Sequence, residues 1–313
     1  MTSHGLAMPA VSQPRRQPLR VNWDAATPYL LLLPAGGVLL AVALYPMSMG
    51  VWLSFRDTSL IEQTDSFIGL DNYRTMLADD GFWNALWHTS LFTAVATFFE
   101  TIIGLGMALI VNQYFTGRGL VRAAMLVPWA VPTVISSKMF GWLFDGQYGI
   151  VNHILLSIGV IDARIPWYSS PDYALITIII ADVWKTTPFM ALLILAGLQT
   201  IPRSLIEAAR VDGATSLQYF WRVCLPLLAP TLLIAAMLRS LDSFRIFDLV
   251  FVLTGGGPAD STEVLSTLTY KNLFSALQFG YGSALATMTF VAEMVIAAGF
   301  GLFLIRRLRV AQN

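Results

Sequence analysis

The chain has 313 residues, of which 56% are hydrophobic and 12% are charged, with 19 basic and 19 acidic side chains and a formal net charge of zero. This composition is too apolar for an ordinary soluble domain, and we expect an all-α membrane protein that crosses the bilayer several times. The balanced charge, without a local basic patch, argues against nucleic acid as a partner, and one cysteine with three scattered histidines provides neither a disulfide nor a metal site.

Six apolar segments follow an N-terminal stretch, residues 1–27, whose Pro, Ser, Gln and Arg content predicts a flexible tail. Each segment reaches the roughly 20 residues needed to cross a bilayer. We expect spans near residues 28–55, 82–111, 120–144, 173–198, 225–253 and 281–305, followed by a short tail at 306–313. Pro128, Pro132 and Pro188 lie inside spans and predict kinks rather than breaks. A cleaved signal peptide is the rival interpretation of the first segment, which is longer than a typical signal core.

The placement of Lys and Arg predicts the orientation, because loops rich in these residues stay in the cytoplasm. Most basic residues outside the spans lie in the two tails, near the loop at 112–119 and in the loop at 199–226. The opposite loops hold only Arg56, Arg74, Arg164 and Lys271. We therefore expect six spans with both termini, and the loop at 199–226, in the cytoplasm.

The loop at 199–226 has a pattern typical of a short amphipathic helix followed by a turn. Pro202 suits a first helical turn, and apolar residues recur after it at helical spacing. Gly213 suits the left-handed position that ends a helix, and Thr215 or Ser216 can cap a second helix. Such an exposed, compact element is suited to fill a groove on another protein.

Glu207, inside the first of these helices, has two possible roles that the residues alone leave open. With Ser204 it matches a capping box, in which the two side chains close the N-terminus of the helix. Alternatively, its carboxylate contacts a partner protein.

The spacing of Glu207-Ala208-Ala209, Gly213 and Leu225-Pro226 resembles the EAA signature of bacterial ABC importer permeases. Further motifs at 67–73, 212–214 and 253–258 resemble the carbohydrate-uptake branch of maltose/trehalose type, and the resemblance covers about residues 28–305. It implies that the loop between the fourth and fifth spans forms a coupling helix that docks on a separate ATPase subunit. The coupling residues implied are Glu207, Ala208, Ala209, Asp212, Gly213, Ala214, Leu225 and Pro226.

The chain carries no nucleotide-binding motif of its own. A P-loop needs Gly-Lys followed by Ser or Thr, whereas the three lysines follow Ser, Trp and Tyr. We therefore expect no catalytic residue and no cofactor bound by this chain, with ATP and Mg on the partner ATPase. The run Gly255-Gly256-Gly257 predicts a flexible external loop rather than a phosphate cradle.

Ionisable groups inside spans are costly and are candidates for function. Asp182 and Lys185 lie three apart on the fourth span, and charges alternate in sign at three-residue steps from Arg239 to Asp248 on the fifth, so each set can pair within its own helix. One interpretation is a polar patch in a translocation path, and the alternative is that these charges only neutralise one another between packed helices. The candidate path residues are Asp182, Trp184, Lys185, Thr186, Phe189, Arg239, Asp242 and Ser243.

Glu100 and Glu293 are isolated acids in the second and sixth spans. For both we expect pairing with another span, or protonation, rather than a substrate role.

The resemblance implies a permease subunit of an ATP-driven sugar importer in the bacterial cytoplasmic membrane, which forms half of the path for a sugar such as trehalose or maltose. The partners that it implies are a second homologous permease subunit, two ATPase subunits and an extracytoplasmic sugar-binding protein, besides the sugar and membrane lipid. The alternative is an ion-coupled secondary transporter of a small polar solute, with Glu100 or Glu293 as a proton relay.

Overall fold

The computed structural model describes residues 23–312, and the chain divides into two units at residue 49. The first unit contains α1 (Trp23–Leu39), the π-helical stretch η1 (Leu40–Leu44) and the start of α2 (Tyr45–Leu53). The apolar run Leu31–Leu53 within these elements is long enough to cross a membrane. Of the predicted tail at 1–27, residues 1–22 lie outside the described residues, and the rest already belongs to α1.

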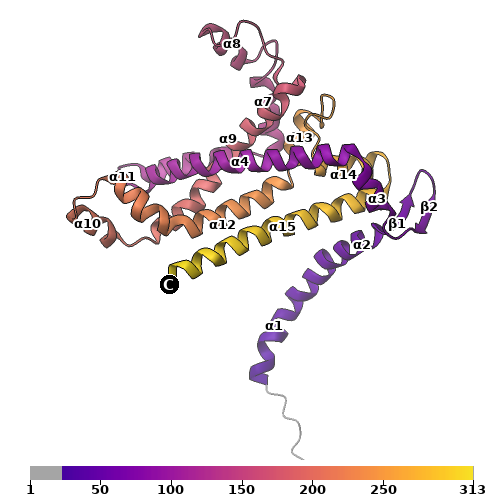
Figure 1. Ribbon diagram of the computed structural model, residues 1–313, viewed down its shortest axis with the longest axis horizontal. Coiled ribbons are helices and arrows are strands. Elements are labelled where there is room, and N and C mark those ends of the chain that lie inside the picture. Colours follow the sequence, from indigo (N-terminus) through magenta and orange to yellow (C-terminus); the bar gives the residue numbers. More distant parts are fainter. Residues whose placement is uncertain (1–22, 313) are drawn as a thin grey trace, which may run out of the picture. The chain divides into compact units, whose positions relative to one another are not determined.

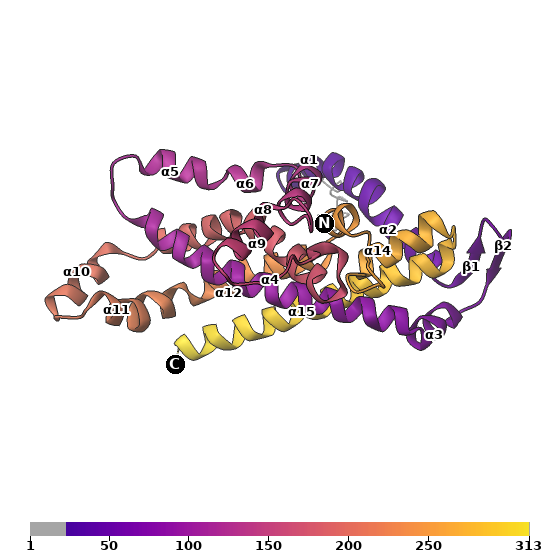
Figure 2. The ribbon, with the colours of Figure 1, turned by 90° about the horizontal axis from the view of Figure 1, so that it is seen from above.

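Four long helices dominate the second unit (Figures 1 and 2): α4 (Asp80–Asn112), α9 (Pro171–Gln199), α12 (Leu225–Phe244) and α15 (Phe279–Gln312). α4 packs most extensively on α9, and α12 packs on α4, α9 and α15. Within the described part of the chain, five helices are long and apolar enough to span a membrane, or six if one bent pair counts as a single span. The expected multi-spanning helical protein is therefore confirmed, with five to six candidate spans.

The third predicted span is the bent pair, and its prolines do more than kink it. Helices α5 (Arg118–Met125) and α6 (Val127–Ala130) are separated from α7 (Thr133–Leu143) by an 87° bend. Val131 is extended because the ring of the following Pro132 disfavours helical backbone at the residue before it. The expectation of a kink rather than a break is thus wrong for Pro132, whereas α9 continues without a break through Pro188.

The fifth predicted span also differs from the structure, because α12 stops at Phe244 and α13 covers only Asp248–Leu253. No proline or glycine marks this break in the sequence. The Ser266 hydroxyl donates a hydrogen bond to the Ile246 carbonyl. This bond compensates a backbone group that the interruption leaves without a helical partner.

Shorter elements connect the long helices, and Figures 1 and 2 place α10 and α11 at one end of the long helices and the strands with α3 at the other. Strands β1 (Arg56–Ser59) and β2 (Thr64–Phe67) form an antiparallel hairpin with Arg56 opposite Phe67, which adds a small sheet to the expected all-α fold. The remaining elements are α3 (Asp71–Ala78), α8 (Ile150–Ser157), η2 (Trp167–Ser169), α10 (Arg203–Val211), α11 (Ser216–Tyr219), η3 (Phe220–Cys224), α14 (Leu265–Tyr270) and η4 (Lys271–Ser275).

Apolar packing along α4 and α9 forms the centre of the second unit. Phe92 on α4 and Ile178 on α9 belong to one buried cluster, and Met190 and Ile194 on α9 belong to another. Close approach of the helices depends on Gly197, where a Cβ atom would clash with the Thr231 side chain of α12. Small residues at such contacts let helix backbones approach closely.

The loop after α13 is closed by hydrogen bonds, in contrast to the flexible loop that its glycines predicted. The Thr262 hydroxyl donates to the Gly257 carbonyl at 2.7 Å and lies 2.8 Å from the Thr254 hydroxyl. Glu263, which is 3% exposed, pairs with Lys271. Gly256 has a φ of +93°, and a Cβ there would overlap the Glu263 carboxylate, so this glycine admits the ion pair.

Candidate functional site

Helix α10 is a short helix with a sharply defined end. Gly213 adopts a φ of +74°, its N–H donates to the Arg210 carbonyl at 3.1 Å, and the Ala214 N–H donates to the Ala209 carbonyl at 2.9 Å. This is the Schellman arrangement, which uses glycine because a side chain disfavours the left-handed backbone. The predicted role of Gly213 in ending the helix is confirmed.

Thr215 starts the next helix, as one of the two predicted caps. Its side chain accepts a hydrogen bond from the Gln218 N–H at 3.2 Å, and the Gln218 side chain accepts one from the Thr215 N–H at 2.8 Å. This reciprocal capping box fixes the turn between α10 and α11. From α11 the chain continues through η3 into α12, where Leu225 and Pro226 occupy the first turn.

Glu207 does not cap its own helix. The N-cap of α10 is Pro202, with no side-chain hydrogen bond, so the alternative capping box with Ser204 is not formed. Glu207 is exposed and has no hydrogen-bond or ion-pair partner among residues 23–312. Ala208, Asp212 and Gly213 are also exposed, whereas Ala209, Ala214 and Leu225 are partly buried. The carboxylate is therefore free to contact another molecule.

Tyr114 links α10 to the end of α4, a contact that the sequence did not predict. The guanidinium of Arg203, the first residue of α10, lies 4.4 Å from the centre of the Tyr114 ring, and that of Arg118 lies 4.6 Å from it. Both distances are within the range of a cation–π interaction. The three residues, here called the Tyr114 stack, join two loops that are far apart in sequence.

A network of charged side chains joins α4, α9 and α12. At its centre is Arg239 on α12, which is 4% exposed. Its Nε donates to Glu100 Oε2 at 2.5 Å and its Nη2 to Glu100 Oε1 at 3.0 Å. Its Nη2 also donates to Asp182 at 2.5 Å, and its Nη1 to Asp242 at 2.5 Å. The Thr186 hydroxyl donates to Glu100 at 2.6 Å.

The pairing within this Arg239 network agrees with the sequence in one helix and differs in the other. Arg239 and Asp242 pair within α12 as expected. Asp182 pairs with Arg239 across helices, and Lys185 has no ion-pair partner in the described part of the chain, so the expected pair within α9 is wrong. The guanidinium carries several N–H donors in a rigid, planar group. It can therefore donate to Glu100 along one edge and to Asp182 and Asp242 along another.

Exposure differs sharply across the Arg239 network. The side chain of Glu100 is 0% exposed and that of Asp182 10%, whereas the side chain of Asp242 is 68% exposed. Ser243 is buried, and its hydroxyl has no hydrogen-bond partner among the residues that the structure describes. Asp242 is thus the member of the network that another molecule can reach.

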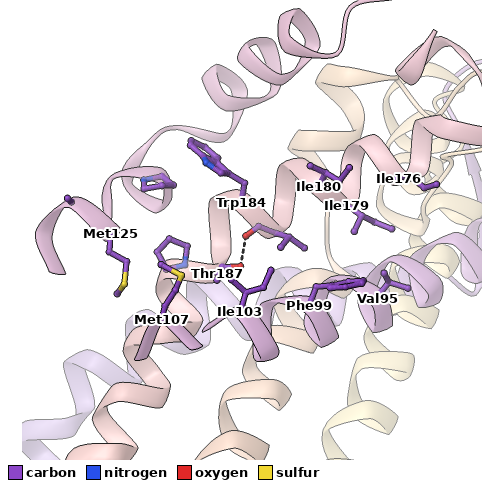
Figure 3. A pocket seen from close by; sticks show the side chains of 14 residues that line it. Val95, Phe99, Ile103, Met107, Met125, Ile176, Ile179, Ile180, Trp184 and Thr187 are labelled. Carbon is purple, nitrogen blue, oxygen red and sulfur yellow. Dashed lines mark hydrogen bonds between the residues drawn. The ribbon is translucent and has the colours of Figure 1, made fainter. Parts of the chain in front are cut away.

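The two predicted aromatic faces pack against other aromatic rings. Phe189 stacks on Trp129 with ring centres 5.4 Å apart and an angle of 11° between the rings. Trp184 packs against Phe140 and lines a hollow of about 780 Å³, which is shown in Figure 3. Side chains of α4, α5, α6 and α9 form the walls, and nearly all of them are apolar.

Sequence reasoning did not include Glu100 among the site residues, although it singled out this acid as unusual. The expected pairing of the isolated acids with another helix is confirmed for both. Glu100 meets Arg239, and Glu293 on α15 lies 3.6 Å from Arg245. Helix α4 carries more acidic than basic residues, which indicated that Glu100 needs a partner on another helix. Only the packing of the helices identifies that partner as Arg239.

Comparison with known proteins relates the chain to transport components. Residues 100–310 match the model of the family described as binding-protein-dependent transport system inner membrane component. The chain is 44% identical to the trehalose/maltose transport system permease protein of Thermococcus litoralis, over 86% of this chain and 90% of that protein.

Two other relatives carry names for different solutes. The sulfoquinovosyl glycerol transport system permease protein of Agrobacterium fabrum is 41% identical, with 88% of this chain and 89% of that protein covered. The trehalose transport system permease protein of Mycobacterium tuberculosis is 39% identical, with 86% and 85% covered.

A solved structure shares the fold. A chain of a bacterial ABC transporter involved in the import of the acidic polysaccharide alginate superposes with a TM-score of 0.78 at 23% identity, covering 91% of this chain and 98% of that chain. At this identity the similarity concerns the arrangement of helices alone.

Proposed function

The chain belongs to the family of binding-protein-dependent transport system inner membrane components, and from this membership we propose that it forms half of the translocation path for a disaccharide such as trehalose or maltose. The observation that carries the proposal is the 44% identity to a trehalose/maltose permease over nearly the whole of both chains. A further relative, at 39% identity, is named for trehalose.

Family membership itself makes the chain a multi-pass permease subunit of the inner membrane in an ABC importer for carbohydrate. Permeases of this family have no nucleotide site, so an ATPase subunit supplies ATP hydrolysis and a periplasmic binding protein supplies the solute. The proposed assembly adds a second homologous permease and two copies of the ATPase, with ATP and Mg bound there.

The proposed contact with the ATPase is α10, with both termini and this helix on the cytoplasmic side. The exposed Glu207, the left-handed Gly213 and the Thr215 cap support it, because they present a free carboxylate on a helix that ends in a fixed turn. Basic residues near α10 and in the tails favour this orientation. Movement of the ATPase then reaches α12 through α11 and η3.

The proposed sugar path runs along the exposed side of the Arg239 network. Asp242 can accept hydrogen bonds from sugar hydroxyls, and Arg239, which is also bonded to Asp182, holds its carboxylate. Thr186 and Ser243 complete the polar part of the proposed lining. Lys185, which has no ion-pair partner within residues 23–312, is available as a donor. Trp184 and Phe189 complete the proposed lining as apolar faces.

Reconstitution of the permease with its ATPase, its second permease and its binding protein in proteoliposomes tests this function. Trehalose or maltose should stimulate ATP hydrolysis and enter the vesicles only when ATP is present. Uptake by the chain alone, driven by an ion gradient, would instead support the secondary transporter. Stimulation by a charged glycoside and by neither disaccharide would contradict the proposed substrate class.

A further inference from the structure

Glu100 is a fully buried acid of α4 that joins three helices. Its carboxylate accepts hydrogen bonds from Thr186 on α9 and from two nitrogen atoms of Arg239 on α12. Helices α4, α9 and α12 contact one another in the packed unit. Because Glu100 is 0% exposed, a solute that follows the surface of this chain cannot touch it, and any influence on transport must pass through its neighbours.

The guanidinium of Arg239 has one edge that faces the buried Glu100 and a second edge that contacts the exposed Asp242. Glu100 occupies Nε and one hydrogen of Nη2 on the buried edge, whereas Asp182 and Asp242 accept from Nη2 and Nη1. A guanidinium is planar and rigid, so fixing one edge fixes the direction of the other. The position of the Asp242 carboxylate therefore depends on a contact made by Glu100 on another helix.

We propose that Glu100 is a positioning residue of the sugar path, which acts through Arg239 to hold the carboxylates of Asp182 and Asp242 in place. The inference rests on the proposed function, because it requires that sugar passes Asp242. An exposed acid ordinarily samples several rotamers, and each immobilised side chain costs free energy when a ligand binds. Arg239 restrains Asp242 before the sugar arrives, and Glu100 restrains Arg239.

A purely structural role for the Glu100–Arg239 pair predicts a different behaviour. Removing one partner of a buried ion pair leaves an uncompensated charge and impairs folding or assembly as a whole. A positioning role affects the passage of sugar in complexes that still assemble and still hydrolyse ATP. The number of sugar molecules transported per ATP hydrolysed separates the two roles.

The experiment uses the complete importer in proteoliposomes, with trehalose and maltose as the probes. E100Q retains size and a hydrogen-bond acceptor, and it should lower the sugar transported per ATP by about tenfold, the order expected when a hydrogen bond to a charged group is lost. ATP hydrolysis stimulated by the loaded binding protein should stay within about twofold of the wild-type rate. E293Q, which changes the acid of α15 that pairs with Arg245, is the matched control and should leave the ratio unchanged.

A double-mutant cycle with Arg239 tests the route of the effect. If Glu100 acts through Arg239, E100Q should cause no additional loss in an R239Q background, because residues that act as one unit are not additive. E100D, which keeps the charge, should restore part of the ratio, and it replaces E100Q if that variant does not assemble.

Three outcomes would overturn the inference. The first is a wild-type number of sugar molecules transported per ATP in E100Q, and the second is a loss in the double variant equal to the product of the losses in E100Q and R239Q. The third is that E100D and E100Q impair only the assembly of the complex. A wild-type complex that transports neither sugar with ATP would overturn the proposed function and this inference together. Wild-type transport combined with an unaltered E100Q ratio would overturn this inference alone.

Discussion

Arg239 and Glu100 are 139 positions apart in the chain and meet through two hydrogen bonds of 2.5 and 3.0 Å. Their contact is fully buried, whereas Asp242, bonded to the same guanidinium, is 68% exposed. The interpretation that these charges only neutralise one another agrees with the burial of Glu100 and Arg239. It does not account for Asp242, whose second carboxylate oxygen has no partner within the described residues.

Replacing Asp242 by Ala should reduce uptake while the complex still assembles. Asp242 is exposed, so its loss leaves Arg239 with two other carboxylates and should change the stability by no more than about 1 kcal/mol. Sugar uptake should fall about tenfold or more if a hydrogen bond between the sugar and this carboxylate is lost. Uptake assays and gel filtration measure the two effects. Asp248, also exposed, supplies the control D248A, and wild-type kinetics in D242A would remove Asp242 from the path.

Replacing Gly197 by Ala should destabilise the contact between α9 and α12. The added methyl group would clash with the side chain of Thr231, and overpacking of this kind costs about 1–3 kcal/mol. Thermal unfolding in detergent should therefore shift to lower temperature. Gly106 on α4, with open space around its Cβ position, provides the control G106A, which should unfold like the wild type. Equal stability of both variants would mean that the helices do not approach this closely.

Acid should loosen the turn between α7 and α8. The N–H groups of Tyr148 and Gln147 donate to Asp145 and hold its pKa below the ordinary value, with the Tyr168 hydroxyl adding to the effect. Because the pKa is lower in the folded state, the stabilisation is complete above the unfolded pKa and disappears as pH falls through the lower folded pKa. Protection of the Gln147 and Tyr148 amides against hydrogen exchange, relative to their intrinsic rates at each pH, should fall in this acidic range. D145N should show fast exchange already at neutral pH, and protection in D145N equal to the wild type would contradict this role.

The features predicted correctly from sequence are those that depend on local chemistry. Gly213 ends a helix because of its own backbone freedom, and Thr215 caps the next one through a residue three positions away. The apolar length of the spans likewise needs no partner. The partner of Glu100 could not be predicted from the sequence, because the prediction requires knowing which face of α4 meets α12.

Breaks in the helices show the same division. The bend near Pro132 is caused by a proline that is visible in the sequence. Because a proline can produce either a kink or a break, the sequence did not predict that the bend would reach 87°. The end of α12 at Phe244 has no local signal and depends on packing, with Phe247 against Phe251 and Tyr270. Helix propensity gives no warning of such an interruption.

Replacing Tyr114 by Ala should weaken the placement of α10. Each cation–π contact at an exposed site contributes about 0.5–1 kcal/mol, and the ring makes two of them, to Arg118 and Arg203. ATP hydrolysis stimulated by loaded binding protein should fall several-fold in Y114A, and Y114F, which keeps the aromatic face, should retain it. A loss of equal size in both variants would attribute the effect to the hydroxyl and contradict the stack.

Changes at Glu207 and Gly213 should separate the permease from its ATPase without affecting membrane insertion. Glu207 has no partner within the described chain, so E207A should leave the stability within about 0.5 kcal/mol of the wild type. Binding of the E207A permease to the ATPase should fall at least about tenfold, as for the loss of one member of an interfacial charge pair.

In G213D, a side chain at a φ of +74° costs roughly 1–2 kcal/mol and disturbs the turn after α10. Co-purification measures the association, and alkaline extraction of membranes measures insertion. E62A, which removes an exposed acid between β1 and β2, is the control. Normal ATPase association and uptake in both E207A and G213D would show that α10 is not the coupling helix.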